Sequence, residues 1–465
     1  MYREKIEAYF AGREDELIQM LTRLASVKSV REEAQEGMPF GKGPADALAV
    51  GLELAGEMGF TTRNVDNYVG VVDLNEHKTI LGILCHLDVV GEGTGWNTPP
   101  YTPTVIGDEI FGRGVSDNKG PAVAALLALK AVKELGVPLK HNVRMIMGTD
   151  EESGSGDIAY YFAREAAPKY TFSPDGTFPV VNTEKGGLKP TFSRSWPVSE
   201  AKPRVVYAKG GYRLNVVPPE AEALVEGMGQ AHVEKVCETV AQKTGATYEV
   251  SMEDGKVKIF VKGKGEHAST PHKGLNAITA LIAALAELPL AESESKKAIH
   301  ALNTLIPHGD FSGTALGIAQ SDAISGSLTV AFTLFELSQT GFTGRFDGRT
   351  PVCTTEENSL DVVVKAFAPY GITVEGKLTP SHHTPGDSPF VKTLLKAYET
   401  YSGNKGFCEY TGGGTYVHNI EGGVCFGATM PGFETNMHGA NEKASIKDLI
   451  TAAKIFTQVI IDLCS

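Results

Sequence analysis

The sequence has few cysteines and no long apolar run, and both absences restrict what the protein can be. Its six cysteines are scattered among 465 residues without a C-x-x-C pair, so free thiols in a reducing cytoplasm are expected rather than a secreted disulfide framework. The best membrane-spanning candidate, AVAALLALKAV, is short and contains Lys130. The first residues, MYREKIEAYF, lack the apolar region of a signal peptide. We therefore expect a cytoplasmic protein with no membrane partner.

Basic residues are also scarce relative to acidic ones. The chain has 43 lysines and arginines against 56 aspartates and glutamates, a formal net charge of -13. Nucleic-acid binding requires a basic surface that neutralises phosphates, so no nucleic-acid partner is expected. The sequence contains no G-x-x-x-x-G-K-[ST] motif and no G-x-G-x-x-G between a strand and a helix, which excludes the common nucleotide-binding loops.

Length and patterning predict two domains, because 465 residues exceed what one hydrophobic core usually organises. Strand and helix patterns alternate from Arg13 to Thr149, among them a helix over Gly120–Leu135 and a buried strand over Asn142–Thr149, and they return near the C-terminus. This alternation predicts an α/β domain with a mixed, largely parallel sheet over residues 1–186 and 382–465. The intervening residues 187–381 show shorter strand patterns with frequent Gly and Pro, mixed with helices. They are predicted to form an inserted α+β domain.

The stretch Thr79–Val90, TILGILCHLDVV, ends an apolar run with a histidine and a carboxylate. Strand side chains alternate, so His86 and Asp88 would point to the same side of the predicted strand. This geometry suits a carboxylate that orients a metal-binding histidine. A hydrogen-bonded pair at a strand end, with no metal, is an equally open interpretation.

Four other places present acids or a histidine where predicted elements meet. Asp117 precedes a helix, residues 150–152 place three carboxylates after a buried strand, Asp175 lies in a Pro-Asp-Gly turn, and His438 follows a polar loop. Each has an ordinary alternative: a helix cap, a solvated acidic loop, a turn residue, or a structural histidine. Together they match a mixed ligand set for Zn²⁺, Mn²⁺ or Co²⁺ at the carboxyl ends of strands. Two metals about 3.5 Å apart would need a bridging carboxylate.

Six stretches of the sequence, in this order, resemble motifs of one metallopeptidase family. They are HLDVV (86–90), GRGVSDNKG (112–120), GTDEESGS (148–155), SPDG (173–176), GKGEHASTPHKGLNA (263–277) and NMHGANE (436–442). The family contains aminoacylases, carnosinases and succinyl-diaminopimelate desuccinylases, and the sequence is most similar to its PepV-type bacterial dipeptidases. The resemblance spans nearly the whole chain.

This resemblance implies a set of metal ligands. His86 and Asp175 would bind one divalent ion, Glu152 and His438 the other, and Asp117 would bridge both. Zn²⁺ is the first expectation, with Mn²⁺ and Co²⁺ as alternatives that the ligand set also allows.

The resemblance also implies catalytic roles beside the metals. Asp88 would hold His86 through a hydrogen bond, and Glu151 would act as the general base that takes a proton from water and returns it to the leaving amine. A cis peptide is expected after the bridging aspartate, between Asp117 and Asn118.

The inserted domain resembles the family's lid and would supply further residues. His267 would stabilise the oxyanion with help from Asn215, and Arg349 would bind the substrate's C-terminal carboxylate as a bidentate fork. In the glycine run of residues 410–419, the backbone N–H of Gly414 is a candidate for the same carboxylate. The length of the insertion resembles that of monomeric members, so a monomer is expected.

We therefore predict a metal-dependent dipeptidase that acts on small peptides with free termini. An N-acyl-amino-acid deacylase is the alternative, because it would use the same metals, base and carboxylate-binding residues. A non-catalytic binding protein with the same fold is a third possibility, but it predicts damage among the ligands or at Glu151, and all of these residues are present.

Overall fold

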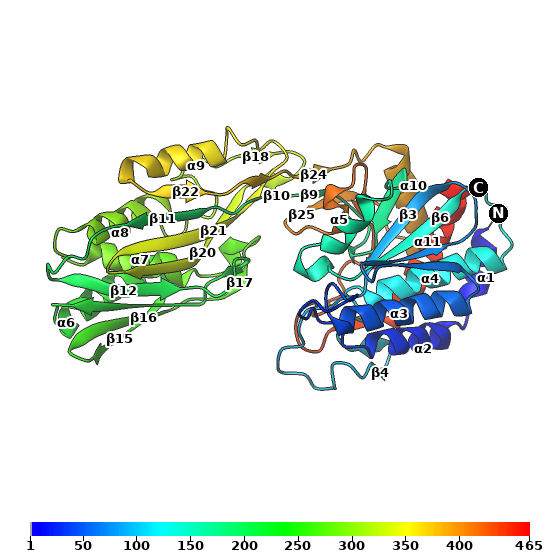
Figure 1. The fold of residues 1–465 in the computed structure, drawn as a ribbon, viewed down its shortest axis with the longest axis horizontal. Coiled ribbons are helices and arrows are strands. Elements are labelled where there is room, and N and C mark those ends of the chain that lie inside the picture. The colour runs from blue at the N-terminus through cyan, green and yellow to red at the C-terminus, as the bar shows by residue number, and fades with distance from the viewer. Residues whose placement is uncertain (1) are drawn as a thin grey trace. The chain divides into compact units, whose positions relative to one another are not determined.

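The computed structural model describes residues 2–465 and divides into two compact units. Unit 1 contains the residues up to Thr183 together with His383–Ser465, and unit 2 contains Glu184–His382. The colours of Figure 1 show that both ends of the chain contribute to unit 1, whereas unit 2 is formed by one continuous middle segment.

Unit 1 is built on a nine-stranded mixed sheet. In spatial order its strands are β1 (Thr61–Val65), β2 (Val69–Asp73), β6 (Asn142–Gly148), β3 (Thr79–His86), β7 (Tyr170–Ser173), β26 (Val424–Cys425), β9 (Val180–Glu184) and β24 (His382–His383), and β25 (Cys408–Thr411) pairs with β9. The neighbours β6, β3, β7 and β26 run parallel, while β1, β2 and β9 make antiparallel pairs. The prediction of an α/β fold with a mixed sheet is confirmed, and the parallel pairs are confined to the run from β6 to β26.

Both faces of this sheet are covered, which explains the continuous apolar run of β3. Ile83 and Cys85 join the large core formed with the helices, and Leu84, which points the other way, packs with Ile158 and Tyr416 on the opposite face. The α-helices of unit 1 are α1 (Arg3–Phe10), α2 (Glu14–Ala25), α3 (Lys42–Glu57), α4 (Lys119–Glu134), α5 (Gly156–Phe162), α10 (Pro389–Ser402) and α11 (Ile446–Cys464).

Helix α4 occupies the centre of the large core of unit 1. Its alanine-rich sequence, KGPAVAALLALKAVKE, is buried over most of its length and packs against α2 and α11. Small side chains let neighbouring helices approach closely without losing helix propensity. The N-terminus of α4 therefore has a fixed position just after Asp117.

One predicted boundary is wrong in a way that affects the site. The strand expected over Thr79–Val90 ends at His86, so Asp88 lies beyond it. The chain leaves the β3 ladder there because Val89 pairs with residues 29 and 30, with its N–H bonded to the carbonyl of Ser29 at 3.1 Å. The argument that strand alternation puts His86 and Asp88 on one face therefore does not apply.

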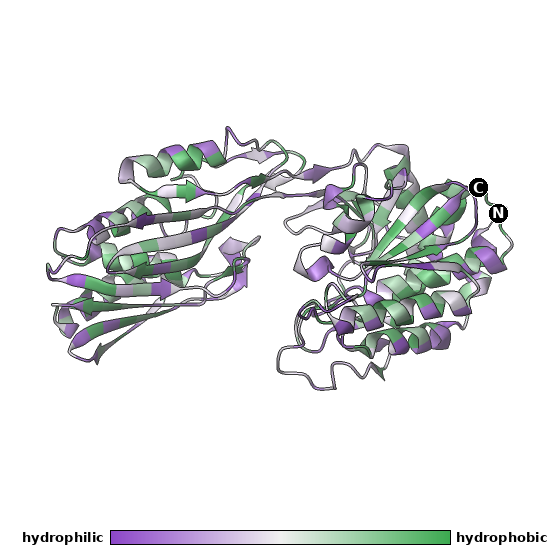
Figure 2. Cartoon of the chain, in the orientation of Figure 1, coloured by the Kyte–Doolittle hydropathy of each residue, from purple (hydrophilic) through white to green (hydrophobic). Residues whose placement is uncertain are grey.

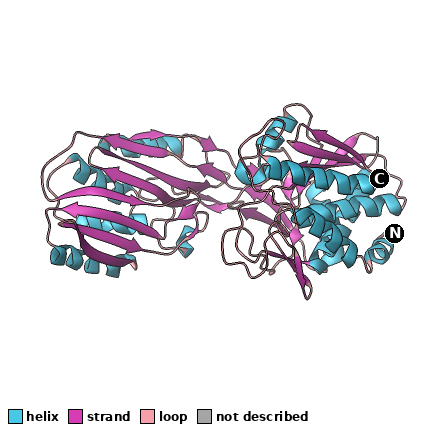
Figure 3. Ribbon diagram, turned by 60° about the horizontal axis from the view of Figure 1, so that its bottom comes forward, coloured by secondary structure: helices cyan, strands magenta, loops and turns pink. Residues whose placement is uncertain are grey.

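Unit 2 contains a ten-stranded antiparallel sheet with helices on one side, as Figure 3 shows. In spatial order its strands are β15 (Thr247–Glu253), β16 (Lys256–Lys262), β14 (Glu220–Glu226), β12 (Arg204–Gly210), β20 (Thr329–Ser338), β21 (Gly341–Thr350), β10 (Gly186–Leu188) and β23 (Leu378–Thr379), with β11 (Thr191–Ser195) on β21 and β22 (Thr373–Glu375) on β11. Its helices are α6 (Gln230–Thr244), α7 (Ala277–Glu287), α8 (Glu294–Leu305) and α9 (Leu360–Phe367).

Several short elements complete the chain. The two-stranded pairs are β13 (Val216–Val217) with β17 (Glu266–His267), β18 (Ser321–Asp322) with β19 (Gly326–Ser327), and β8 (Gly176–Thr177) with β27 (Ala428–Thr429). A small sheet joins β28 (Lys443–Ser445), β5 (Glu109–Phe111) and β4 (Thr104–Ile106), and the 3₁₀ turns are η1 (Glu151–Ser153), η2 (Pro271–Lys273), η3 (Ala368–Tyr370) and η4 (Tyr416–Asn419).

Hydrophobic residues are frequent along the strands and helices of each unit (Figure 2), and the buried ones form two separate large cores. All six cysteines are free thiols, as expected from their spacing. Among residues 2–465, no helix combines the length and the apolar character needed to cross a bilayer.

Candidate metal centre and active site

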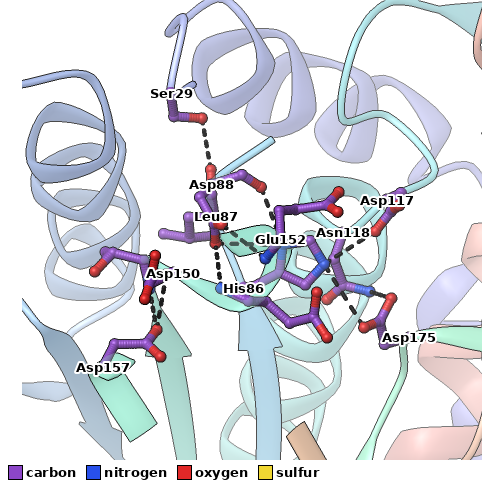
Figure 4. Close-up of polar contacts among 12 residues, drawn as sticks. Ser29, His86, Leu87, Asp88, Asp117, Asn118, Asp150, Glu152, Asp157 and Asp175 are labelled. Carbon is purple, nitrogen blue, oxygen red and sulfur yellow. Dashed lines mark hydrogen bonds and ion pairs between the residues drawn. The ribbon is translucent and has the colours of Figure 1, made fainter. Parts of the chain in front are cut away.

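Six acidic and histidine side chains from five places in the sequence meet at one edge of the unit 1 sheet, and Figure 4 shows part of this cluster. His86 is the last residue of β3, Glu151 and Glu152 begin η1 just after β6, and Asp175 follows β7. Because β6, β3 and β7 are parallel neighbours, their carboxyl ends lie at the same edge.

The carboxylate of Asp117 lies between the two histidines. His86 Nε2 is 2.9 Å from Asp117 Oδ1, and His438 Nε2 is 2.9 Å from Asp117 Oδ2. His86 Nε2 is also 3.6 Å from Asp175 Oδ2, and His438 Nε2 is 3.2 Å from Glu152 Oε1. The two imidazoles thus each face a second carboxylate, and Asp117 is common to both groups.

The donor set fits two divalent cations. One ligand atom each from His86, Glu151 and Asp175 lie within 4.8 Å of one another, and so do those from His86, Asp117 and Glu152. Glu152 Oε1 is buried and makes no hydrogen bond of good geometry among the described residues. Four carboxylates and two imidazoles around one point are the oxygen and nitrogen ligands that Zn²⁺, Mn²⁺ and Co²⁺ accept.

The electrostatics of the cluster also favour a cation. Burial raises the pKa of Glu151 well above its ordinary value, and the negative charge of Asp175 raises it further. Burial likewise raises the pKa of Glu152. The hydrogen bond to Asp117 is the main reason that the pKa of His438 rises to about 10. Positive charge from metal ions would stabilise the carboxylates and replace the protons on the imidazoles.

Asp88 contacts both His86 and the turn of Glu151 and Glu152. Its shortest contact with His86 is made by the backbone carbonyl and not, as predicted, by the carboxylate. His86 Nδ1 lies 3.0 Å from the backbone carbonyl of Asp88, while the carboxylate Oδ1 is farther away at 3.5 Å. The carboxylate instead accepts hydrogen bonds from the backbone N–H groups of Glu151 and Glu152, both at 3.1 Å. When His86 Nδ1 donates to the carbonyl, Nε2 keeps the lone pair that a metal requires.

Asn118 links the proposed bridging aspartate to Asp175. The Asp117–Asn118 peptide is cis, as the family resemblance implies. The Asn118 side-chain amide donates to the carbonyl of Pro174 at 3.0 Å and to Asp175 Oδ1 at 3.2 Å. This contact orients the Asp175 carboxylate.

The structure adds two residues that the sequence patterns did not single out, Asp157 and Tyr416. The buried Asp157 carboxylate accepts hydrogen bonds from the backbone N–H groups of Thr149 and Asp150 and from the Tyr416 hydroxyl. Burial raises the pKa of Asp157 to about 6. The Tyr416 ring meets the His86 ring edge-on, with centroids 6.3 Å apart. The sequence did contain a sign that Asp157 belongs to the site, because this residue follows the acidic loop by only a few residues.

Gly414 is exposed and lies between β25 and η4, two residues before Tyr416. Its loop therefore belongs to unit 1, and Tyr416 connects it to the cluster around His86. In the same loop the Gly413 N–H donates to Thr411 Oγ1 at 3.1 Å.

Two of the predicted lid residues are neighbours within unit 2. Val216, next to Asn215, pairs with His267 between β13 and β17, and the N–H of Ala268 donates to the carbonyl of Asn215 at 2.9 Å. The exposed His267 ring has Nδ1 2.6 Å from Ser269 Oγ. The structure thus brings Asn215 and His267 together on one short ribbon.

Arg349, on β21 of the same unit, makes a contact that the prediction did not include. Its Nε and Nη2 donate to Asp347 Oδ1 and Oδ2, both at 2.8 Å, and the Asp347 side chain is fully buried. The Nε–Nη2 edge of the guanidinium is therefore directed at Asp347, and this ion pair sets the orientation of the side chain.

Comparisons with known proteins identify the family of the chain. A sequence model of peptidase family M20/M25/M40 matches residues 82–462. A Bacillus subtilis protein named "Putative dipeptidase YtjP" is 34% identical over 457 residues, which cover 97% of this chain and 98% of the relative.

Two solved structures share the fold. Human carnosine dipeptidase 1 aligns with a TM-score of 0.60 at 15% identity, covering 99% of this chain and 98% of that one. The YXEP protein of Bacillus subtilis, described as a dinuclear metal-binding peptidase, aligns with a TM-score of 0.51 at 12% identity, covering 98% of this chain and 99% of that one.

The fold and the acidic, histidine-containing cluster define a metallopeptidase. The chain belongs to peptidase family M20/M25/M40, since the family match covers most of its length. The predicted family and the predicted class of enzyme are both confirmed.

Proposed function

We propose that this metallopeptidase hydrolyses dipeptides with free N- and C-termini at a centre of two divalent cations. The observation that carries the proposal is the position of Asp117, whose two carboxylate oxygens each lie 2.9 Å from a different histidine. A carboxylate in that position can bridge two ions. The names of the Bacillus subtilis relative and of the dinuclear neighbour support the same assignment.

We assign His86 and Asp175 to one ion, Glu152 and His438 to the other, and Asp117 to both. Zn²⁺ is the first candidate and Mn²⁺ or Co²⁺ the alternatives, because two imidazole nitrogens among carboxylate oxygens suit these ions. When bound, such a pair of cations lowers the pKa of water and polarises the peptide carbonyl.

Glu151 is the residue that we assign to proton transfer. Burial and the charge of Asp175 raise the pKa of Glu151, and the Asp88 carboxylate holds its backbone N–H at 3.1 Å. In the proposed reaction its carboxylate accepts a proton from the attacking water and then delivers that proton to the departing amine. Asp88 fixes the turn from which Glu151 projects.

The proposal extends to four residues for substrate binding. His267 would donate a hydrogen bond to the developing oxyanion, assisted by its neighbour Asn215, and unit 2 would act as the lid that carries them. Arg349, whose orientation is set by the buried Asp347, would bind the substrate's C-terminal carboxylate together with the backbone N–H of Gly414. We further propose that the enzyme works as a monomer in the cytoplasm.

The test compares a free dipeptide with its N-acetylated and C-amidated forms, each over the same range of concentrations. The proposal predicts that the free dipeptide is cleaved with the highest kcat/KM and that amidation mainly raises KM, because it removes the C-terminal charge. Faster release of acetate from an N-acetyl amino acid than of an amino acid from the dipeptide would instead identify a deacylase. Glu151→Gln, measured in parallel, shows that turnover belongs to this enzyme and not to a contaminating peptidase.

A further inference from the structure

A fully buried ion pair joins two loops of the proposed metal centre. Arg113 Nη1 lies 2.6 Å from Glu442 Oε2, and the side chains of the two residues are 1% and 0% exposed. The Trp96 ring lies over the guanidinium with its centroid 5.3 Å away. Neither residue faces the six clustered side chains of the centre as a ligand, and two charges so completely removed from water need compensating contacts.

Glu442 uses both carboxylate oxygens to hold the loop that ends at Asp117. Oε2 accepts a hydrogen bond from the N–H of Gly114 at 3.0 Å, and Oε1 accepts from the N–H groups of Ser116 at 2.9 Å and Asp117 at 3.1 Å. A carboxylate that accepts several backbone N–H groups fixes the path of the loop. The backbone position of the proposed bridging ligand therefore depends on Glu442.

Arg113 holds the other loop beside His438. Its Nη2 donates to the carbonyl of Gly439, the residue after His438, at 3.1 Å and to the carbonyl of Gly91 at 3.3 Å. His438 has a φ of 62°, and Asn436 and Asn441 in the same loop have φ values of 52° and 58°. Residues other than glycine rarely adopt this left-handed backbone, which persists only where surrounding contacts impose it.

The opposite side of the centre has supports of its own. His86 is buried at the end of β3 and contacts the carbonyl of Asp88, and the carboxylate of Asp175 accepts from the amide of Asn118. By contrast, the His438 side chain is 51% exposed. Its placement rests more on its loop than on packing.

We propose that Arg113 and Glu442 are positioning residues that fix the backbones of Asp117 and His438 relative to each other. The affinity for the ion assigned to Glu152 and His438 would therefore depend on this pair. This inference rests on the proposed dinuclear function. Glu442→Gln keeps the size of the side chain but replaces one acceptor oxygen by an amide donor facing backbone N–H groups. Arg113→Lys keeps the positive charge but loses the second guanidinium arm, which reaches Gly439.

The experiment measures binding of Zn²⁺ to the full-length apoprotein by competition with a chromophoric chelator, and records Co²⁺ absorption spectra. His438→Ala identifies which of the two binding steps involves that side chain. For Arg113→Lys we expect the same step to weaken at least tenfold, with the other step changed less than threefold and the Co²⁺ bands of the affected ion altered. For Glu442→Gln, which also loosens the backbone of the bridging Asp117, we expect both steps to weaken, the His438 step at least threefold more than the other. Arg144→Lys is the control, since Arg144 also pairs with a carboxylate of unit 1, that of Asp73, but on strands β6 and β2 and not in the loops of the centre.

The outcomes separate this inference from the proposed function. If the wild-type protein binds fewer than two ions, the proposed dinuclear function fails. If it binds two ions and both variants bind each of them with an affinity within twofold of that of Arg144→Lys, the positioning role is overturned. It is also overturned if both variants weaken the two binding steps equally. Circular dichroism of the apoproteins checks folding, and if one variant is unfolded, the other, which acts from the opposite side of the same pair, decides the result.

Discussion

His438 Nε2 lies 2.9 Å from Asp117 Oδ2, although the whole of unit 2 separates these two residues in the sequence. The contact joins a loop near the C-terminus to the loop before α4. It places an imidazole and a carboxylate at the distance of a strong hydrogen bond, where the carboxylate's other oxygen already faces His86. Because both histidines face the same carboxylate, loss of metal should affect both sides of the centre together.

Removal of metal should abolish turnover and lower stability together. Without cations the clustered carboxylates of Asp117, Glu151, Glu152 and Asp175 repel one another, and each ion present at 100 times its Kd contributes about 2.7 kcal/mol to the free energy of unfolding. Dialysis against a chelator should therefore abolish dipeptide hydrolysis and lower Tm. Zn²⁺, Mn²⁺ or Co²⁺ should restore both, and Mg²⁺, which favours oxygen ligands only, should restore less. Full activity in excess chelator would contradict the metal assignment.

Glu151→Gln should separate catalysis from metal binding. The amide cannot accept a proton, so kcat should fall roughly 10²- to 10⁴-fold. The metal content should remain that of the wild type, as measured by atomic absorption after gel filtration. Glu152→Gln is the matched control one residue away, and it should lose metal as well as activity. A normal rate for Glu151→Gln would remove this residue from the mechanism.

Asp88→Asn should weaken the centre without removing a ligand. The Asp88 carboxylate accepts from the N–H groups of Glu151 and Glu152 with one oxygen each, and an asparagine can satisfy only one of them. We expect about a 10- to 100-fold loss in metal affinity or kcat/KM.

The control for Asp88→Asn is Asp73→Asn, on β2 of the same sheet. Asp73 accepts from Arg144 and Asn142 and does not contact the cluster. This variant should lower Tm but leave kcat/KM of the folded enzyme unchanged. Equal effects of the two substitutions on kcat/KM would show that Asp88 supports only the general stability of unit 1.

His308 should make the stability of unit 2 depend on pH. Burial lowers its pKa, and its Nδ1 lies 2.9 Å from Thr279 Oγ1 while Nε2 lies 3.1 Å from the carbonyl of Thr244. The folded protein therefore favours neutral imidazole, whereas the unfolded chain takes up a proton near pH 6.5. The contribution of His308 to the free energy of unfolding is fully present above that pH. It decreases as the pH drops below it, by at most about 1.4 kcal/mol per pH unit for one proton.

The measurement compares denaturant unfolding of the protein at pH 7.5 and 5.5. Hydrogen exchange of the amides near Thr244 and Thr279 monitors the unfolding of unit 2. His308→Gln should reduce the difference between the two pH values. His300→Gln, on the exposed face of α8, should leave the difference as in the wild type. An unchanged pH dependence in His308→Gln would assign the effect to other groups.

Much of the fold could be predicted from local patterns. The helix expected over Gly120–Leu135 is α4, and the strand expected over Asn142–Thr149 is β6, each within one residue. Such elements are recognisable because a 3.6- or 2-residue periodicity of apolar side chains is repeated over several turns or pleats. Short elements such as β13 and β17, which carry Val216 and His267, have no such period and were not predicted.

The amino-acid sequence by itself determined the chemistry that is available: which side chains can bind a cation, which acid stands beside them, and which family the motifs resemble. Only the tertiary structure decided which partner each group takes. Asp88 turned out to hold Glu151 and Glu152 through its carboxylate, Arg349 to face Asp347, and Arg113 to pair with Glu442. The physical reason is that periodicity is a property of a few consecutive residues, whereas these contacts depend on where the backbone turns after each strand ends and on loops brought together from both ends of the chain.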